Sequence, residues 1–127
     1  MPTVGPFATR RSHVAGVPVT EIARQFGTPT YVYDAAKIVE RIEDLRKFDV
    51  IRFAQKACSN LAVLALARSK GVVVDAVSAG EIHRAYLAGY RPGGEPAPIV
   101  YTADIFDRES LELVVSRNIP VNVGSID

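Results

Sequence analysis

A lysine stands where a short apolar run gives way to a helical segment, in FAQKACSNLAVLALARSKG at residues 53–71. The amine of Lys56 is a poor nucleophile while it is protonated in water. Burial against apolar walls lowers the pKa of a lysine, and the neutral amine can then condense with an aldehyde. The position predicts either a solvated strand end or a lysine enclosed for covalent chemistry, and periodicity alone favours the solvated strand end.

Polar side chains also follow the other apolar runs of the chain. Asp75 interrupts the run VVVDAV, where a carboxylate must find a partner or cost several kcal/mol. The residues leave a site role and a structural role for Asp75 equally open. Glu81 has a simpler explanation, because the helix dipole stabilises an acid in the first turn of a helix. Further candidates at the ends of runs are Ser78, Thr102, Asp104 and Asn122.

The elements that would position these groups alternate regularly from residue 49 onward. We expect strands at 49–55, 72–78, 98–103 and 119–124, and helices at 59–71, 79–89 and 108–118. Strands and helices in this order, joined by short loops, are typical of parallel βαβ units. The expected fold class is α/β, corresponding to the N-terminal half of a (β/α)₈ barrel. Active groups of such barrels lie at the carboxyl ends of the strands, where the candidate side chains fall.

The residues before this alternation predict two further helices. Residues 17–27 carry apolar side chains at helical spacing, and Gly27 is a plausible C-terminal stop. An extended run with aromatic residues follows at 28–34. Asp34 then occupies the expected N-cap of an amphipathic helix at 35–48.

Composition excludes several classes of function. The formal net charge of +1 gives no electrostatic case for a nucleic-acid partner. The longest apolar run covers residues 61–67, far short of the roughly 20 residues that a membrane-spanning helix needs. The single cysteine, Cys58, permits no internal disulfide and suits a reducing compartment. His13 and His83 are far apart in sequence, so we expect no metal site.

Two segments resemble the barrel-type pyridoxal-phosphate-dependent decarboxylases of diaminopimelate, ornithine and arginine. Residues 53–71 are similar to the family's cofactor-attachment segment: an aromatic residue, a small residue, any residue, the lysine, then an apolar helix leading to a glycine. VDAVSAGEIHRAYLAG, residues 74–89, looks like the family's second block, in which a strand aspartate precedes a serine and a Gly-Glu pair. The resemblance implies an alanine racemase-like, PLP-binding (β/α)₈ barrel, preceded by a short segment of the family's β domain.

The same resemblance implies roles for three residues. Lys56 would bind pyridoxal 5'-phosphate covalently and serve in proton handling once the substrate amine displaces it. Asp75 would lie near the cofactor and the lysine. Ala54 would contact the cofactor ring, which must pass close above its strand. The family's phosphate-binding glycine loop and the residues supplied by a second subunit would lie beyond residue 127.

Within the family, the opening VPVTEIARQFGTPTYVYD favours the diaminopimelate branch. The expected function is decarboxylation of meso-diaminopimelate to L-lysine by a cytoplasmic homodimer that binds a small amino-acid substrate. YTADIFDRES departs from the family pattern of a glycine, an asparagine and a lysine. A decarboxylase of ornithine, arginine or carboxynorspermidine, and a noncatalytic binding homologue of the same fold, remain alternatives.

The length of the chain predicts an incomplete fold. Four parallel strands cannot close a barrel, and an open parallel edge invites self-association. We therefore expect residues 35–127 to form the first half of the barrel and residues 1–34 to belong with the β domain. The chain alone is expected to be inactive, marginally stable and prone to associate.

Overall fold

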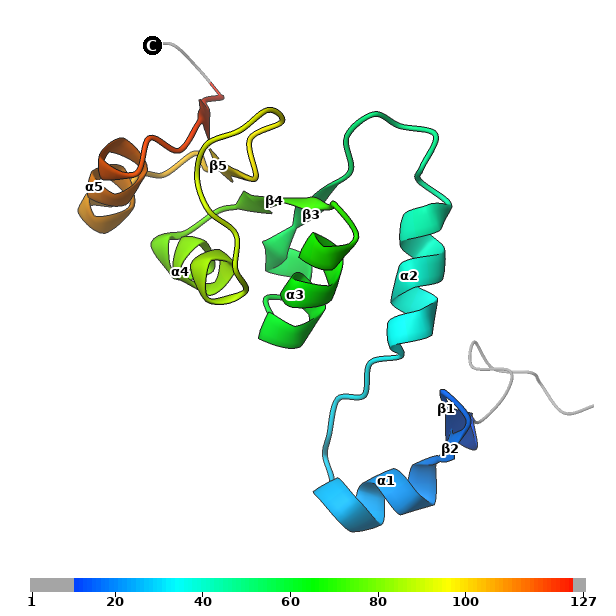
Figure 1. Ribbon diagram of the computed structural model, residues 1–127. Coiled ribbons are helices and arrows are strands. Elements are labelled where there is room, and N and C mark those ends of the chain that lie inside the picture. Colours follow the sequence, from blue (N-terminus) through cyan, green and yellow to red (C-terminus); the bar gives the residue numbers. More distant parts are fainter. Residues whose placement is uncertain (1–10, 125–127) are drawn as a thin grey trace, which may run out of the picture. The chain divides into compact units, whose positions relative to one another are not determined.

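The computed structural model describes residues 11–124, and its elements follow the expected alternation of strands and helices (Figure 1). The chain divides into two compact units, residues 1–38 and 39–127. Residues 1–10 of the expected N-terminal segment lie outside the described residues. No helix between residues 11 and 124 is long and apolar enough to cross a bilayer.

The first unit contains a short hairpin and a helix. Strand β1 (His13–Val14) pairs antiparallel with β2 (Val17–Pro18), and α1 (Val19–Phe26) follows directly. Gly27 ends α1 as expected, with a φ of 81° that favours glycine. No strand forms in the extended run that the sequence predicts before Asp34.

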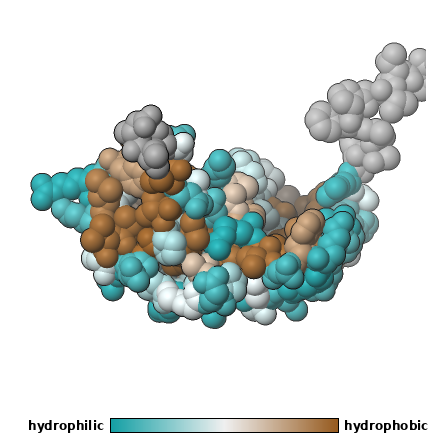
Figure 2. Space-filling view, turned by 90° about the horizontal axis from the view of Figure 1, so that it is seen from above, coloured by the Kyte–Doolittle hydropathy of each residue, from teal (hydrophilic) through white to brown (hydrophobic). Residues whose placement is uncertain are grey.

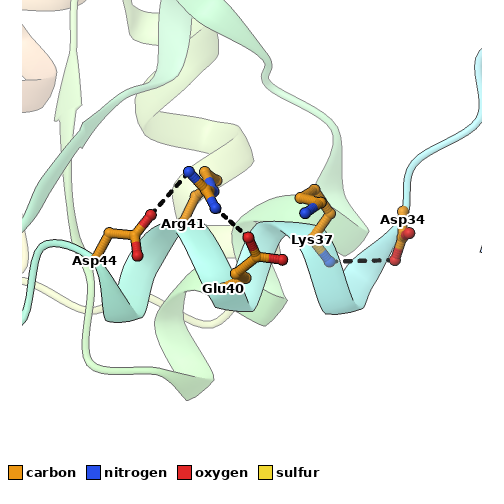
Figure 3. Close-up of polar contacts among 5 residues, drawn as sticks. All are labelled: Asp34, Lys37, Glu40, Arg41 and Asp44. Atoms are coloured by element: carbon orange, nitrogen blue, oxygen red, sulfur yellow. Dashed lines mark hydrogen bonds and ion pairs between the residues drawn. The ribbon is translucent and has the colours of Figure 1, made fainter.

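Helix α2 (Ala35–Glu43) begins at the expected cap (Figure 3). The carboxylate of Asp34 accepts a hydrogen bond from the backbone N–H of Lys37 at 3.2 Å. Arg41 forms ion pairs with Glu40 and, at 2.9 Å, with Asp44, as the dashed lines in Figure 3 show. These groups are exposed, so the pairs add little stability. The helix ends before residue 48, and turns replace its expected last part.

The second unit is built on one parallel sheet. Its strands are β3 (Arg52–Ala54), β4 (Val73–Ala76), β5 (Ile99–Thr102) and β6 (Val121–Asn122), arranged in sequence order β3-β4-β5-β6. All neighbouring strands are parallel. The connecting helices are α3 (Leu61–Ser69), α4 (Ala79–Leu87) and α5 (Arg108–Ser116). The predicted alternation is confirmed, with shorter elements than expected.

All three connecting helices pack on the same face of the sheet. Leu64 of α3, Ile82 of α4 and Val114 of α5 belong to one buried cluster with Val74 and Tyr101 of the strands. Sequential strand order with helices on a single face is the winding of a (β/α)₈ barrel, whereas doubly wound sheets carry helices on both faces. The α/β half-barrel expected from the sequence is thus the fold observed.

Helix α5 corrects one expectation about the core. The sequence predicts that Leu111, Val114 and Val115 face inward, but Leu111 is 45% exposed and Val115 is 78% exposed. The helix instead buries Ser110 and Val114, which lie one turn apart on the same side. Apolar residue type therefore misidentified the inward stripe of this helix.

Strand β6 is the last strand of the described sheet and pairs only with β5 there. Figure 2 shows a broad hydrophobic area, in brown, at the left of that view. Exposed apolar side chains in the second unit include Ile105 and Val123. The free edge and the apolar surface would allow the sheet to add further strands.

The N-cap of α3 yields a first testable prediction. The side-chain oxygen of Asn60 accepts hydrogen bonds from the N–H groups of Ala62 at 2.9 Å and Val63 at 3.3 Å. Asn60→Ala is expected to lower the free energy of unfolding by about 1 kcal/mol, because these donors lose their acceptor. Asn60→Ser should retain most of the stability in urea unfolding. Equal losses in the two variants would contradict the capping role.

Candidate active site

The loops that follow the four strands emerge at one edge of the sheet, because parallel strands share their direction. A one-turn 3₁₀ helix, η1 (Gln55–Ala57), follows β3, and Ser78 follows β4. Asp104 comes after β5, and Asn122 ends β6. The candidate residues of the sequence are therefore gathered at the carboxyl edge.

Lys56 lies in η1, two residues beyond the last residue of β3. Its side chain is exposed and makes no hydrogen bond or ion pair with residues 11–124. The enclosure that covalent chemistry would require is therefore absent from this part of the fold. The physical reason is that the connecting helices described between residues 11 and 124 pack on one face of the four-stranded sheet, and none of them covers the other face.

Asp75 and Ala54 lie side by side on the face that no described helix covers. Ala54 is the register partner of Asp75, and Asp75 is the register partner of Val100. Because paired residues of parallel strands point to the same face, these three side chains form a row. The helix-packed face carries their chain neighbours, among them Val74 and Ile99.

The carboxylate of Asp75 has an unusual environment. Its Oδ1 atom is buried and accepts no hydrogen bond from the described residues. A buried acceptor without a donor is costly, so its presence suggests a use other than stability. The neighbouring Ala54 has the smallest side chain after glycine and carries no donor that could reach the carboxylate.

Two further candidates contact each other at the same edge. Asn122 donates a hydrogen bond from its side-chain nitrogen to Oγ1 of Thr102 at 2.8 Å. Asp104 is exposed, and a Cβ added to Gly124 would stand 3.1 Å from its Oδ1. Asp104 and Gly124 are therefore close neighbours, and glycine at 124 leaves room for the carboxylate.

Ser78 and Glu81 are structural rather than chemical. Oγ of Ser78 accepts a hydrogen bond from the N–H of Glu81 at 3.2 Å, which caps α4. The carboxylate of Glu81 accepts one from the N–H of Val77 at 2.9 Å. These two bonds resemble a capping box, with the carboxylate bound to the residue before the N-cap, and they confirm the helix-start interpretation of Glu81. They also fix the beginning of α4 to the end of β4.

Two residues that contact or neighbour the lysine turn, Gln55 and Arg84, escaped the sequence analysis. Gln55 is fully buried, and both polar atoms of its side chain lack hydrogen-bond partners in the described part of the chain. Gln55 lies two residues after Phe53, and alternate residues of a strand point to the same face, so the sequence could have predicted that Gln55 is buried. Arg84 donates a hydrogen bond to the backbone oxygen of Ser59 at 3.2 Å, and a contact over this sequence separation has no local signal.

The residue types at this edge suit an organic aldehyde cofactor. A flat ring that carries an aldehyde needs an amine to bond with, a polar group to orient it and space beside the strand. Lys56 offers an amine without a partner among the described residues, Asp75 a buried carboxylate oxygen without a donor, and Ala54 a small side chain beside it. Within residues 11–124, no group of three or more His, Cys, Asp or Glu side chains could hold a metal ion. The donor set thus fits pyridoxal phosphate.

Comparison with protein families gives an independent result. Residues 35–127 match the model described as "Pyridoxal-dependent decarboxylase, pyridoxal binding domain". The chain is 60% identical over 103 residues to the diaminopimelate decarboxylase of Streptomyces coelicolor, and 55% identical over 103 residues to that of Escherichia coli K12. Each match covers 81% of this chain, but only 23% and 24% of those proteins. The chain therefore spans about a quarter of the length of these relatives.

Solved structures give the same result for the fold. A crystal structure of diaminopimelate decarboxylase superposes with a TM-score of 0.82 at 52% identity, covering 86% of this chain and 26% of the other. The Helicobacter pylori diaminopimelate decarboxylase complexed with L-lysine has a TM-score of 0.73 at 33% identity, covering 84% of this chain and 28% of the other. The expected fold class and family are confirmed. The chain belongs to the pyridoxal-dependent decarboxylases, and residues 35–127 make up the part of it that matches their pyridoxal binding domain.

Proposed function

We propose that the full-length protein decarboxylates meso-diaminopimelate to L-lysine with pyridoxal 5'-phosphate. The observation that carries the proposal is the placement of Lys56 just past β3, next to the register pair Ala54–Asp75. Identity of 55–60% to two diaminopimelate decarboxylases supports this substrate over other amino acids.

Each of the three residues would have a distinct task. Bound pyridoxal phosphate supplies an electron sink that makes loss of carbon dioxide feasible. Lys56 would hold the cofactor covalently through its amine and then exchange protons near the substrate. The buried Oδ1 of Asp75 would accept a hydrogen bond and orient its donor. Ala54 would leave room for the cofactor beside β3.

Release of labelled carbon dioxide tests the substrate. We expect the full-length protein, loaded with cofactor, to release it from carboxyl-labelled meso-diaminopimelate far faster than from ornithine or arginine. Faster release from ornithine or arginine would show that the protein is a decarboxylase of that amino acid instead. No release from any of them, with no covalent cofactor, would point to a noncatalytic binding homologue.

We also propose the organisation of the full-length protein. Residues 35–127 would form the first half of the barrel, and residues 1–34 would belong with the β domain. The start of the family match at residue 35 supports this division. The full-length protein would be a cytoplasmic homodimer, and sedimentation at micromolar concentration would reveal a monomer if the dimer proposal is wrong.

Asp75 gives a prediction that separates stability from function. Without cofactor, Asp75→Asn is expected to raise the free energy of unfolding by about 1 kcal/mol, because a partly buried carboxylate with an unpaired oxygen becomes a neutral amide. Cofactor affinity, followed by fluorescence titration, should fall in the same variant. The control is Asp49→Asn, an exposed position before β3, which should change neither quantity. Loss of stability in Asp75→Asn would contradict the site role.

A further inference from the structure

The turn that carries Lys56 is closed by hydrogen bonds on its own backbone. The carbonyl oxygen of Gln55 accepts one from the N–H of Cys58 at 2.9 Å and another from Oγ of Ser59 at 3.0 Å. Lys56 lies inside this closed turn. Its own side chain contributes nothing to the closure, because it contacts no polar group within residues 11–124.

A side chain of the neighbouring helix α4 also contacts the turn. Nη1 of Arg84 donates a hydrogen bond to the carbonyl oxygen of Ser59 at 3.2 Å, and Arg84 lies 25 residues later in α4. The start of α4 is fixed in turn to the end of β4 through Ser78 and Glu81. A chain of hydrogen bonds therefore runs from the lysine turn through α4 to the end of the strand that carries Asp75.

This chain of contacts has a consequence for the amine of Lys56. In the described part of the molecule, nothing fixes the side chain itself, so the backbone of residues 55–59 sets where the amine can reach. Displacement of a reacting group by about 1 Å can reduce a rate by as much as 10²-fold. Holding the turn against α4 would keep the lysine and the β4 carboxylate at a constant separation.

We propose that Arg84 is a positioning residue, which holds the lysine-bearing turn at a fixed place relative to Asp75. The proposal rests on the proposed function, since it gives Lys56 a cofactor to meet. Arg84 itself is exposed and lies in the helix layer, so it would act through Ser59 and would not touch the cofactor.

The test uses the full-length protein with Arg84→Gln and Arg84→Lys. Cofactor is added to apoprotein, and borohydride trapping at increasing times gives the rate of covalent attachment to Lys56. We expect attachment to slow by about tenfold in Arg84→Gln, and Arg84→Lys to recover part of the rate because one donor remains. Arg84→Gln should also shift the pH midpoint of the absorbance of the bound cofactor.

A second readout needs no cofactor. Hydrogen exchange of the Cys58 amide, which closes the turn, should be faster in Arg84→Gln than in wild type. Ser59→Ala, which removes the other bond to the Gln55 oxygen, should change exchange and attachment in the same direction. The matched control is Arg108→Gln, an arginine whose side chain is 92% exposed and which pairs with Glu112 of its own helix. It should behave as wild type in every assay.

The outcomes separate the two proposals. Faster Cys58 exchange without any effect on attachment or on the pH midpoint would overturn the positioning role and leave the proposed function intact. If Arg84→Gln and Arg108→Gln behave alike in all assays, the positioning role of Arg84 is also overturned and the proposed function is left intact. Absence of trapped cofactor on Lys56 in the wild type would overturn both proposals.

Discussion

Full-length protein in which methionine replaces Lys56 is expected to lose decarboxylase activity by about 10⁴-fold or more, since the group that bonds to the cofactor is removed. Borohydride treatment followed by peptide mapping should label Lys56 in the wild type and no lysine in the variant. Lys56→Arg should be equally inactive, because a guanidinium stays protonated and cannot condense with an aldehyde. A positive charge alone at position 56 is therefore not expected to support decarboxylation.

Lys70→Met provides the matched control for that experiment. Lys70 is the C-cap residue of α3, which runs back from the lysine turn, so Lys70 lies toward the opposite edge of the sheet. The substitution removes the same charge from the same chain and should leave activity and labelling unchanged. Trapped cofactor on another lysine in Lys56→Met, with retained activity, would show that the attachment site has been misidentified.

The positions of the functional groups could be predicted because they depend on local pattern. Strand and helix alternate strongly from residue 49, so the carboxyl edge of the sheet and the place of Lys56 on it followed from the sequence. Recognition of residues 53–71 as an attachment segment needed only the residue types. The N-cap of α3 is also local: the residue types allow Ser59 or Asn60, and in the structure Asn60 accepts hydrogen bonds from backbone donors two and three residues away.

What could not be predicted depends on contacts between distant segments. The register that sets Ala54 beside Asp75 is a property of strand pairing, and shifting it by one residue would turn the carboxylate to the other face. The exposure of Lys56 depends on which other segments of the fold pack around its side chain. The residue type alone does not indicate this. In α5, the packing of the helix buries the small polar residue Ser110 and leaves Val115 exposed, and residue type alone does not reveal this.

Tyr90 shows the same dependence on long-range contacts and leads to the second large effect. It is 2% exposed within the hydrophobic cluster, and its hydroxyl donates a hydrogen bond to the carbonyl oxygen of Val72 at 2.9 Å. The oxygen of Leu64 lies 3.3 Å away. The hydroxyl thus lies between the first half of α3 and the residue before β4. Burial raises the pKa of Tyr90 to about 12, and the nearby guanidinium of Arg68 opposes the rise only in part.

The raised pKa predicts a specific loss of stability in alkali. The folded chain holds the phenol proton more tightly than the unfolded chain, whose tyrosines titrate near pH 10. The contribution of the Tyr90 hydroxyl to the free energy of unfolding is therefore complete below about pH 10, and it declines as the pH rises toward about 12. A difference of about two pKa units corresponds to roughly 2–3 kcal/mol of unfolding free energy.

Tyr90→Phe isolates this contribution from the other groups that titrate in alkali. Below pH 10 the variant should be less stable than wild type by about 1 kcal/mol, because the carbonyl of Val72 loses its donor. Between pH 10 and pH 12 the order should reverse, since phenylalanine has no proton to lose while the wild type loses about 1.4 kcal/mol per pH unit in this range. Urea unfolding of both proteins across this range would reveal the crossover. Parallel stability curves without a crossover would mean that the Tyr90 hydroxyl is solvated in the folded protein, and that α3 and β4 are not joined through it.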